Sequence, residues 1–222
     1  MTKIQPHQRV NDILLAPLER PALKWLAANM PAWVNPDILT VMGILGALLT
    51  FFGYLMSNYR TEFLWLASLG FVINWFGDSL DGTLARHRQI ERPKYGFFVD
   101  HTVDAFNEVL IVIGLGLSPY VNFSVACLAL IGYLLMSVLV YIRTYINGVF
   151  QLSYGKFGPT EIRVILILLN TIMFFVGILP IDLPLGLTTI YDIPISLIAV
   201  ILGILFTTGS IQNAIALAKL EE

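Results

Sequence analysis

The chain consists of long apolar runs separated by short polar connections. Each run has about 20 residues or more, the length that an α-helix needs to cross the hydrocarbon core of a bilayer. The runs lack the alternation of apolar and polar residues that is typical of membrane β-strands. We therefore predict six transmembrane helices. They are expected at residues 37–58, 61–85, 96–118, 121–147, 160–180 and 193–218.

A short segment before the first run has a different pattern. In PALKWLAANMPAW, the residues Ala22, Trp25, Leu26 and Met30 recur near helical spacing. This spacing predicts a short amphipathic helix lying on the membrane surface. The chain is thus divided into a cytoplasmic N-terminal segment, residues 1–36, and a six-helix domain, residues 37–222.

Composition supports an integral membrane protein of the all-α class. Of the 222 residues, 57% are hydrophobic and 13% are charged, and the mean hydropathy is +0.77. Soluble domains carry about twice that share of charged residues. The composition therefore favours one compact helical domain in the membrane, and we expect no nucleic-acid partner.

Basic residues indicate how the predicted helices are oriented. They gather before the first span, between the second and third spans, and between the fourth and fifth spans. The connections on the other side carry only Arg60 as a basic residue, together with Asp182 and Asp192. Because lysine and arginine accumulate in cytoplasmic loops, we predict that both termini are cytoplasmic.

Four aspartates interrupt the apolar pattern where the second and third spans meet. Asp78 and Asp81 precede the polar turn, and Asp100 and Asp104 follow it. Spacings of three and four residues place each pair on one face of its helix. A short turn makes the two helices antiparallel, so the four carboxylates are expected at similar depth, about 6–12 Å below the turn.

Carboxylates gathered inside a membrane need positive partners, because burying each one alone is costly. Within the two helices only Arg86, at the edge, is basic. Hard oxygen ligands suit Mg²⁺ or Mn²⁺, so we predict a divalent-metal site; capping of helix ends or a polar crevice is the alternative. The small residues Gly82, Ala85 and Gly96, together with the fork of Arg86, favour the approach of a diphosphate.

These positions resemble the signature of the CDP-alcohol phosphotransferases. The pattern reads Asp78-x2-Asp81-Gly82-x2-Ala85-Arg86, then Gly96-x3-Asp100-x3-Asp104, and all eight motif positions are filled. Nine residues separate the two halves, where the usual pattern has eight. The extra residue falls in the polar turn, so we expect it to alter the loop and not the helix faces. VNPDILTVMG, with Pro36 and Thr40, resembles the family's opening of the first span.

The resemblance implies an integral membrane enzyme of phospholipid biosynthesis, often a homodimer, with its active site facing the cytoplasm. Such an enzyme transfers a substituted phosphoryl group from a CDP-linked donor to an acceptor hydroxyl and releases CMP. It further implies that Asp78, Asp81 and Asp100 hold Mg²⁺ or Mn²⁺, two ions per site, and that Asp104 completes the metal site or acts as the base. The residues implied to line the cytidine and diphosphate are Gly82, Ala85, Arg86 and Gly96.

His101 is a second candidate for the base. The run DHTVDAFN resembles a stretch of the choline and ethanolamine phosphotransferases, and GPTEIR resembles a later stretch that ends at a glutamate, here Glu161. The resemblance makes a pair of His101 and Glu161 a candidate base. Alternatively, His101 forms a hydrogen bond to a neighbouring helix, and Glu161 stabilises the start of its own helix through the helix dipole.

Further polar residues lie near these positions. Arg143, Lys156 and Arg163 are predicted on the cytoplasmic side and are candidates to bind an acidic acceptor group, although positive-inside anchoring explains them equally well. Asn107 and Glu108 lie one turn beyond the last aspartate and are candidates to orient it or to contact another helix.

Two classes of donor fit the residues. CDP-diacylglycerol with a small alcohol acceptor is slightly favoured over CDP-choline-like head groups acting on diacylglycerol. A divalent-metal transporter is the alternative from another class. Because the run VLIVIGLGL after Glu108 offers no polar path across the membrane, the enzyme is preferred.

Overall fold

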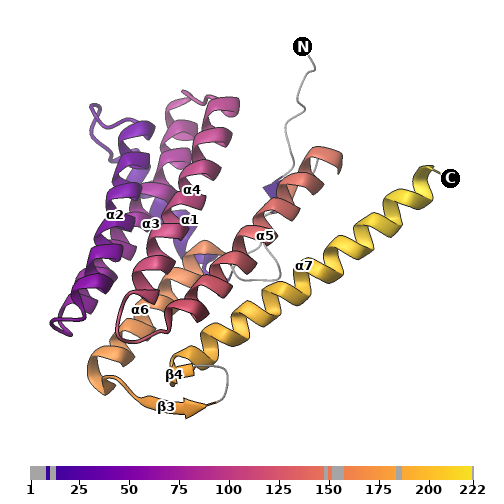
Figure 1. Ribbon diagram of the computed structural model, residues 1–222. Coiled ribbons are helices and arrows are strands. Elements are labelled where there is room, and N and C mark those ends of the chain that lie inside the picture. Colours follow the sequence, from indigo (N-terminus) through magenta and orange to yellow (C-terminus); the bar gives the residue numbers. More distant parts are fainter. Residues whose placement is uncertain (1–8, 11–13, 148–149, 152–157, 184–186, 222) are drawn as a thin grey trace.

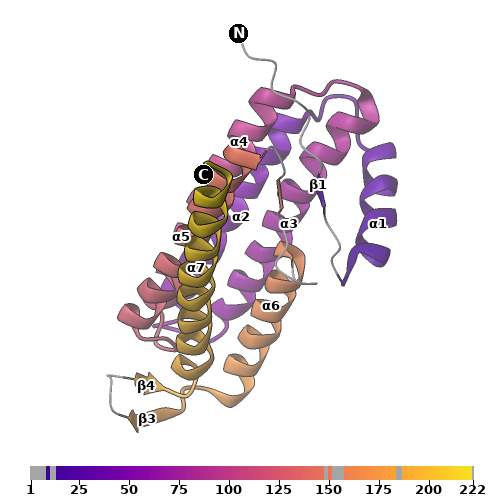
Figure 2. The same cartoon turned by 90° about the vertical axis from the view of Figure 1, so that its right-hand side faces the viewer.

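The computed structural model describes residues 9–10, 14–147, 150–151, 158–183 and 187–221. Over these residues the chain forms seven helices and two short pairs of strands (Figures 1 and 2). The helices are α1 (Ala16–Ala28), α2 (Pro36–Met56), α3 (Phe63–Arg88), α4 (Pro93–Gly116), α5 (Phe123–Asn147), α6 (Pro159–Val176) and α7 (Asp192–Glu221). The strands β1 (Arg9–Val10) and β2 (Phe150–Gln151) are parallel, and β3 (Pro180–Leu183) and β4 (Leu187–Thr189) are antiparallel.

Among the described residues, five helices are long and apolar enough to cross a membrane: α2, α3, α5, α6 and α7. α4 has a similar length but carries Asp100, Asp104 and Glu108 in its apolar stretch, which keeps it outside this group by composition. The helical, membrane-type architecture is thus confirmed. The sixth span, formed by α4, remains a prediction.

α2 and α3 pack directly against one another at the centre of the bundle. A Cβ added at Gly46 would lie 2.8 Å from the Cα of Asn74, and one added at Gly53 would lie 2.5 Å from the backbone nitrogen of Ala67. Helix backbones approach this closely only where no side chain separates them. The Asn74 amide also donates a 2.9 Å hydrogen bond to the carbonyl of Gly43, so the register of the two helices is well defined.

α6 joins this pair through a buried amide. Asn170 accepts a 2.9 Å hydrogen bond from the hydroxyl of Tyr54 in α2. It donates a 3.1 Å hydrogen bond to the hydroxyl of Ser68 in α3. Buried polar groups are stable when they find partners, and here the two partners come from two other helices. α6 is therefore held against α3 in a defined position.

α5 and α7 form a second pair, which runs side by side and tilts away from α2 and α3 (Figure 1). The base of α7 is tied down by Asp192, a fully buried residue whose carboxylate accepts backbone hydrogen bonds from Asn122 at 2.7 Å, Thr188 at 2.7 Å and Thr189 at 3.0 Å. These bonds attach the helix to the α4–α5 connection and to β4. The rest of α7 is largely exposed.

A helix is present in the N-terminal segment, and one of its faces packs against the protein. The spacing in the sequence grouped Trp25 with Leu26 and Met30. In the structure Leu23 and Ala27 are buried, whereas Trp25 is 66% exposed. α1 packs against α3, on the side away from α5 and α7 (Figure 2), so contact with protein sets its rotation. Its location on the membrane surface remains a prediction.

Candidate active site

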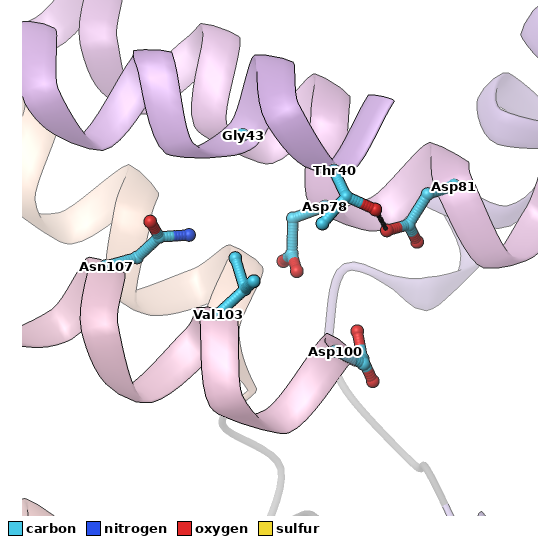
Figure 3. Close-up of a pocket in the computed structure, with 7 residues that line it drawn as sticks. All are labelled: Thr40, Gly43, Asp78, Asp81, Asp100, Val103 and Asn107. Carbon is cyan, nitrogen blue, oxygen red and sulfur yellow. Dashed lines mark hydrogen bonds between the residues drawn. The ribbon is translucent and has the colours of Figure 1, made fainter. Parts of the chain in front are cut away.

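A pocket opens between α2, α3 and α4 (Figure 3). It encloses about 200 Å³, open mouth included. The residues that line it are Thr40, Gly43, Asp78, Asp81, Asp100, Val103 and Asn107. Three of the four predicted metal ligands therefore meet in one place.

The turn between α3 and α4 produces this meeting. Gln89, just after α3, adopts the left-handed conformation with φ 57°, and the N–H of Ile90 donates a 3.0 Å hydrogen bond to the carbonyl of Ala85. These contacts end the helix. Pro93 then starts α4, because its fixed φ suits a first helical position. The turn is short, so the aspartate faces of the two helices oppose each other as predicted.

Asp81 is oriented from two sides. Its Oδ2 accepts a 2.7 Å hydrogen bond from the hydroxyl of Thr40 (Figure 3). Its Oδ1 accepts a 2.5 Å hydrogen bond from the N–H of Gly82. Thr40 lies at the start of α2, in the stretch that resembles the family's first span. The first and second predicted spans thus contribute together to the position of this carboxylate.

Asp78 forms an ion pair with a distant arginine that its sequence spacing does not predict. Nη2 of Arg163 lies 2.7 Å from its Oδ2, and Nε of Arg163 donates a 2.9 Å hydrogen bond to the side-chain oxygen of Asn74. The second and third spans by themselves offer only Arg86 as a basic residue. The structure adds a second one, because α6 brings Arg163 into the cluster from 85 residues further along the chain.

Asp104 completes the cluster from α4. Its carboxyl group lies within hydrogen-bonding reach of Asp78 and in the electrostatic field of Asp100. Ligand atoms of Asp100, His101 and Asp104 all lie within 4.8 Å of one another. The guanidinium of Arg163 offsets one of the four carboxylate charges, and close carboxylates repel unless cations join them. The donor set therefore fits one or more divalent cations with hard oxygen ligands.

His101 lies beside the carboxylates in an aromatic setting. Its Nδ1 is 3.3 Å from Asp100. The ring of Tyr141, from α5, is stacked on it with the ring centres 5.5 Å apart, and the ring of Phe97 meets it edge-on at 4.2 Å. Tyr141 is not among the residues predicted for the site; it belongs to the run YIRTY, which carries no signal of its own in the sequence. Only the packing of α5 against α4 brings it to this place.

Glu161 has a structural role at the start of α6. Its Oε1 accepts a 2.7 Å hydrogen bond from the N–H of Leu15, and its Oε2 accepts one of 2.9 Å from the N–H of Gly158. The residue is buried. The alternative that it stabilises its own helix therefore matches these contacts. Its pairing with His101 as a base remains a prediction.

The remaining predicted residues lie in several environments. The guanidinium of Arg86 would contact a Cβ added at Gly82, at 3.4 Å, and a Cβ added at Gly96 would have open space around it. Ala85 is half-buried on the same side of α3. Arg143 donates a 3.1 Å hydrogen bond to Asn213 of α7. Lys156 lies outside the described residues.

Taken together, the helices and the carboxylate pocket define a membrane-type helical protein with a candidate metal site at one end of its central bundle. The chain matches the CDP-alcohol phosphatidyltransferase family over residues 33–208. This match covers most of the chain, and the protein belongs to that family. The resemblance seen in the motif is thereby confirmed.

Individual relatives fall into two groups. The chain is 28% identical to "Cholinephosphotransferase 1" of Danio rerio over 164 residues, 69% of this chain and 42% of the relative. It is 33% identical to "Archaetidylinositol phosphate synthase" of Pyrococcus horikoshii over 104 residues, 47% and 52% of the two chains. It is 34% identical to "Phosphatidylinositol phosphate synthase" of Cutibacterium acnes over 90 residues, 40% and 41%. The chain spans about half the length of the curated relatives it matches.

Proposed function

We propose that the protein is a metal-dependent membrane transferase that moves a substituted phosphoryl group from a CDP-linked donor to an acceptor hydroxyl, releasing CMP. The observation that carries this proposal is the meeting of Asp78, Asp81 and Asp100 in one pocket, with Asp104 adjacent. Membership of the CDP-alcohol phosphatidyltransferase family supports the same reaction.

The four aspartates would hold Mg²⁺ or Mn²⁺, two ions per site. Bound ions of this kind neutralise charge on a diphosphate and on the departing nucleotide. The chain orients its own ligands for this task, because Asp81 is fixed by Thr40 and Asp78 by Arg163. Preorganised ligands need no rearrangement when the substrate arrives.

The donor would lie along the turn side of the pocket. Gly82 and Gly96 leave room for the cytidine and diphosphate, Ala85 keeps the wall small, and Arg86 is exposed close by. A planar guanidinium suits a phosphate. Arg163, Arg143 and Lys156 are proposed for the acceptor; the ion pair with Asp78 places Arg163 against the pocket.

The acceptor hydroxyl must lose its proton, and Asp104 or His101 takes it. Asp104 lies within reach of Asp78, and the imidazole of His101 contacts Asp100. Asp104→Asn and His101→Ala separate the two assignments. A much larger loss of activity in the histidine variant favours the imidazole, and the reverse order favours the carboxylate.

We propose two classes of CDP-linked donor. The sequence slightly favours CDP-diacylglycerol with a small alcohol acceptor. A CDP-linked head group acting on diacylglycerol is the second candidate, because the cholinephosphotransferase relatives align with 69–97% of this chain, against 40–47% for the inositol phosphate synthases.

The membrane arrangement forms part of the proposal. We infer that α4 is a sixth span, that both termini and the pocket face the cytoplasm, and that the protein is a homodimer. The distribution of lysine and arginine supports the orientation. A reporter enzyme that is active only outside the cytoplasm can be fused after Glu222. Activity of that fusion would contradict the proposed orientation.

Release of CMP tests the function. The purified full chain is assayed in detergent or vesicles with Mg²⁺ or Mn²⁺, using CDP-diacylglycerol with polar alcohols and CDP-choline with diacylglycerol. CMP should appear with one donor class only, and a chelator should abolish its release. Metal transport into vesicles without any CMP release would favour the transporter instead.

A further inference from the structure

Asn107 occupies the closed end of the pocket. It follows Asp100 and Val103 along one face of α4, and all three line the pocket (Figure 3). The turn end is open, because Arg86 is exposed and Gly96 has free space around it. Asn107, in contrast, is only 5% exposed. The pocket therefore has an accessible end and a buried, polar end.

The amide of Asn107 has an unsatisfied hydrogen-bond acceptor. Its side-chain oxygen is buried and has no hydrogen-bond partner among the described residues. A buried polar atom without a partner is costly, and such groups are normally paired. An apolar side chain would pack there without this cost. In Figure 3 the amide nitrogen of Asn107 faces the aspartates and the oxygen is turned towards α2. A half-turn of the amide exchanges the two atoms, and a ligand that donates a hydrogen bond would then satisfy the oxygen at the pocket.

The proposed reaction places such a donor at the closed end. In a phosphoryl transfer the attacking and leaving oxygens lie roughly in line on opposite sides of the phosphorus. If the departing CMP lies at the turn end, beside Arg86, and the transferred group lies at the aspartates, then the attacking hydroxyl enters from the far side. That side is where Asn107 lies, one turn beyond Asp104.

We propose that the side-chain oxygen of Asn107 accepts a hydrogen bond from the acceptor's hydroxyl group and orients it for in-line attack. This inference rests on the proposed function. Asn107 is then a substrate-binding residue for the alcohol, and not a partner that orients a carboxylate. The proton itself still passes to the base, Asp104 or His101, so the asparagine changes neither charge nor covalent structure.

Three variants test this role in the full-length protein. Asn107→Leu keeps the shape and removes the acceptor atom, whereas Asn107→Asp keeps an acceptor oxygen in the same place. Phe106→Leu is the matched control, because Phe106 is the neighbouring residue on α4 and is 51% exposed. Each variant is assayed for the KM of the acceptor and for Mg²⁺-dependent binding of CMP. The acceptors are diacylglycerol and glycerol 3-phosphate, each with its matching CDP-linked donor.

Asn107→Leu should raise the acceptor KM about tenfold or more, as expected for the loss of one hydrogen bond to a substrate hydroxyl, while CMP affinity stays within about twofold. Asn107→Asp should recover part of the loss, and Phe106→Leu should behave as wild type. An unchanged acceptor KM in Asn107→Leu, or an equal loss of CMP affinity, overturns the inference.

The wild-type protein keeps this test separate from the proposed function. If the wild type neither binds CMP nor releases it, the proposed function fails. If the wild type is active, the results for the Asn107 variants alone decide whether Asn107 binds the acceptor. Should Asn107→Leu not fold, Asn107→Ala removes the same atom and is scored in the same way.

Discussion

The α2–α3 and α5–α7 pairs pack in different ways. At the α2–α3 contact a Cβ on Gly46 or Gly53 would collide with backbone atoms of the facing helix. At the α5–α7 contact a Cβ on Gly132 would meet the side chain of Leu202 at 3.0 Å, and one on Gly209 would meet that of Leu139 at 3.1 Å. The α2 and α3 backbones are therefore in direct contact, whereas side chains separate α5 from α7 at these two glycines.

The closer helix packing is found on the side of the molecule that carries the candidate active site. The pocket lies on the α2–α3 side, where ligand positions must hold to a fraction of an ångström for catalysis. In its most apolar stretch α3 is 44% buried, against 6% for α7. α7 is tied at its base through Asp192 and contacts α5 beyond it. We therefore expect substitutions to matter most on the α2–α3 side, and the following predictions test this contrast.

The largest effect is expected at the carboxylates. Asp81→Asn or Asp100→Asn should reduce CMP release on the order of 1,000-fold, equivalent to about 4 kcal/mol in the barrier, because each removes a charged ligand of the metal site. The helical circular dichroism should be unchanged. Asp37→Asn is the matched control, since Asp37 pairs with Arg92 outside the pocket. Full activity in either pocket variant would contradict the metal-ligand assignment.

Alanine substitutions of Arg163 and Arg143 compare the side of the molecule that carries the pocket with the α5–α7 pair, using the same type of residue. Arg163→Ala should lower the stability of metal-free protein by about 2–3 kcal/mol, because it leaves the half-buried Asp78 carboxylate without its partner. Added Mg²⁺ should restore part of this loss by binding the folded state. Arg143→Ala, which removes the hydrogen bond to Asn213, should cost about 1 kcal/mol. Thermal unfolding in detergent, with EDTA or with Mg²⁺, measures the stability of both variants. Equal losses of stability would contradict the expected difference between the two sides of the molecule.

Added methyl groups probe the packing directly. Gly46→Ala should destabilise the protein by about 2 kcal/mol, as overpacking does, and should also reduce activity. Gly209→Ala should change stability by less than about 1 kcal/mol, because the end of Leu139 can move aside and alanine favours the helix. Unfolding temperatures compare the two. If Gly209→Ala were the more harmful change, the packing difference would not hold.

The smallest effect is expected at Glu161. Glu161→Gln replaces a carboxylate that accepts two backbone hydrogen bonds by an amide with one acceptor oxygen, and should cost about 1 kcal/mol of stability. CMP release should fall only in proportion to the folded fraction. A large loss of activity at unchanged stability would instead assign Glu161 to the base with His101.

Much of the architecture could be read from local pattern. The apolar runs located the six long helices within a few residues, because a membrane-type helix needs a continuous apolar surface and its own backbone hydrogen bonds. The motif identified the family, and helical spacing with a short turn predicted that Asp78, Asp81 and Asp100 would meet. Each of these features depends on residues close together in the sequence.

Contacts between distant segments could not be read in this way. The ion pair of Arg163 with Asp78, the stacking of Tyr141 on His101 and the rotation of α1 all depend on how separate helices dock. The sequence by itself determined the helices, the family and the carboxylate cluster, since periodicity and spacing act within one or two turns. Tertiary structure alone decided which arginine offsets the cluster, which amide closes the pocket and which face of α1 is buried, because those outcomes depend on side-chain packing between helices that no local pattern encodes.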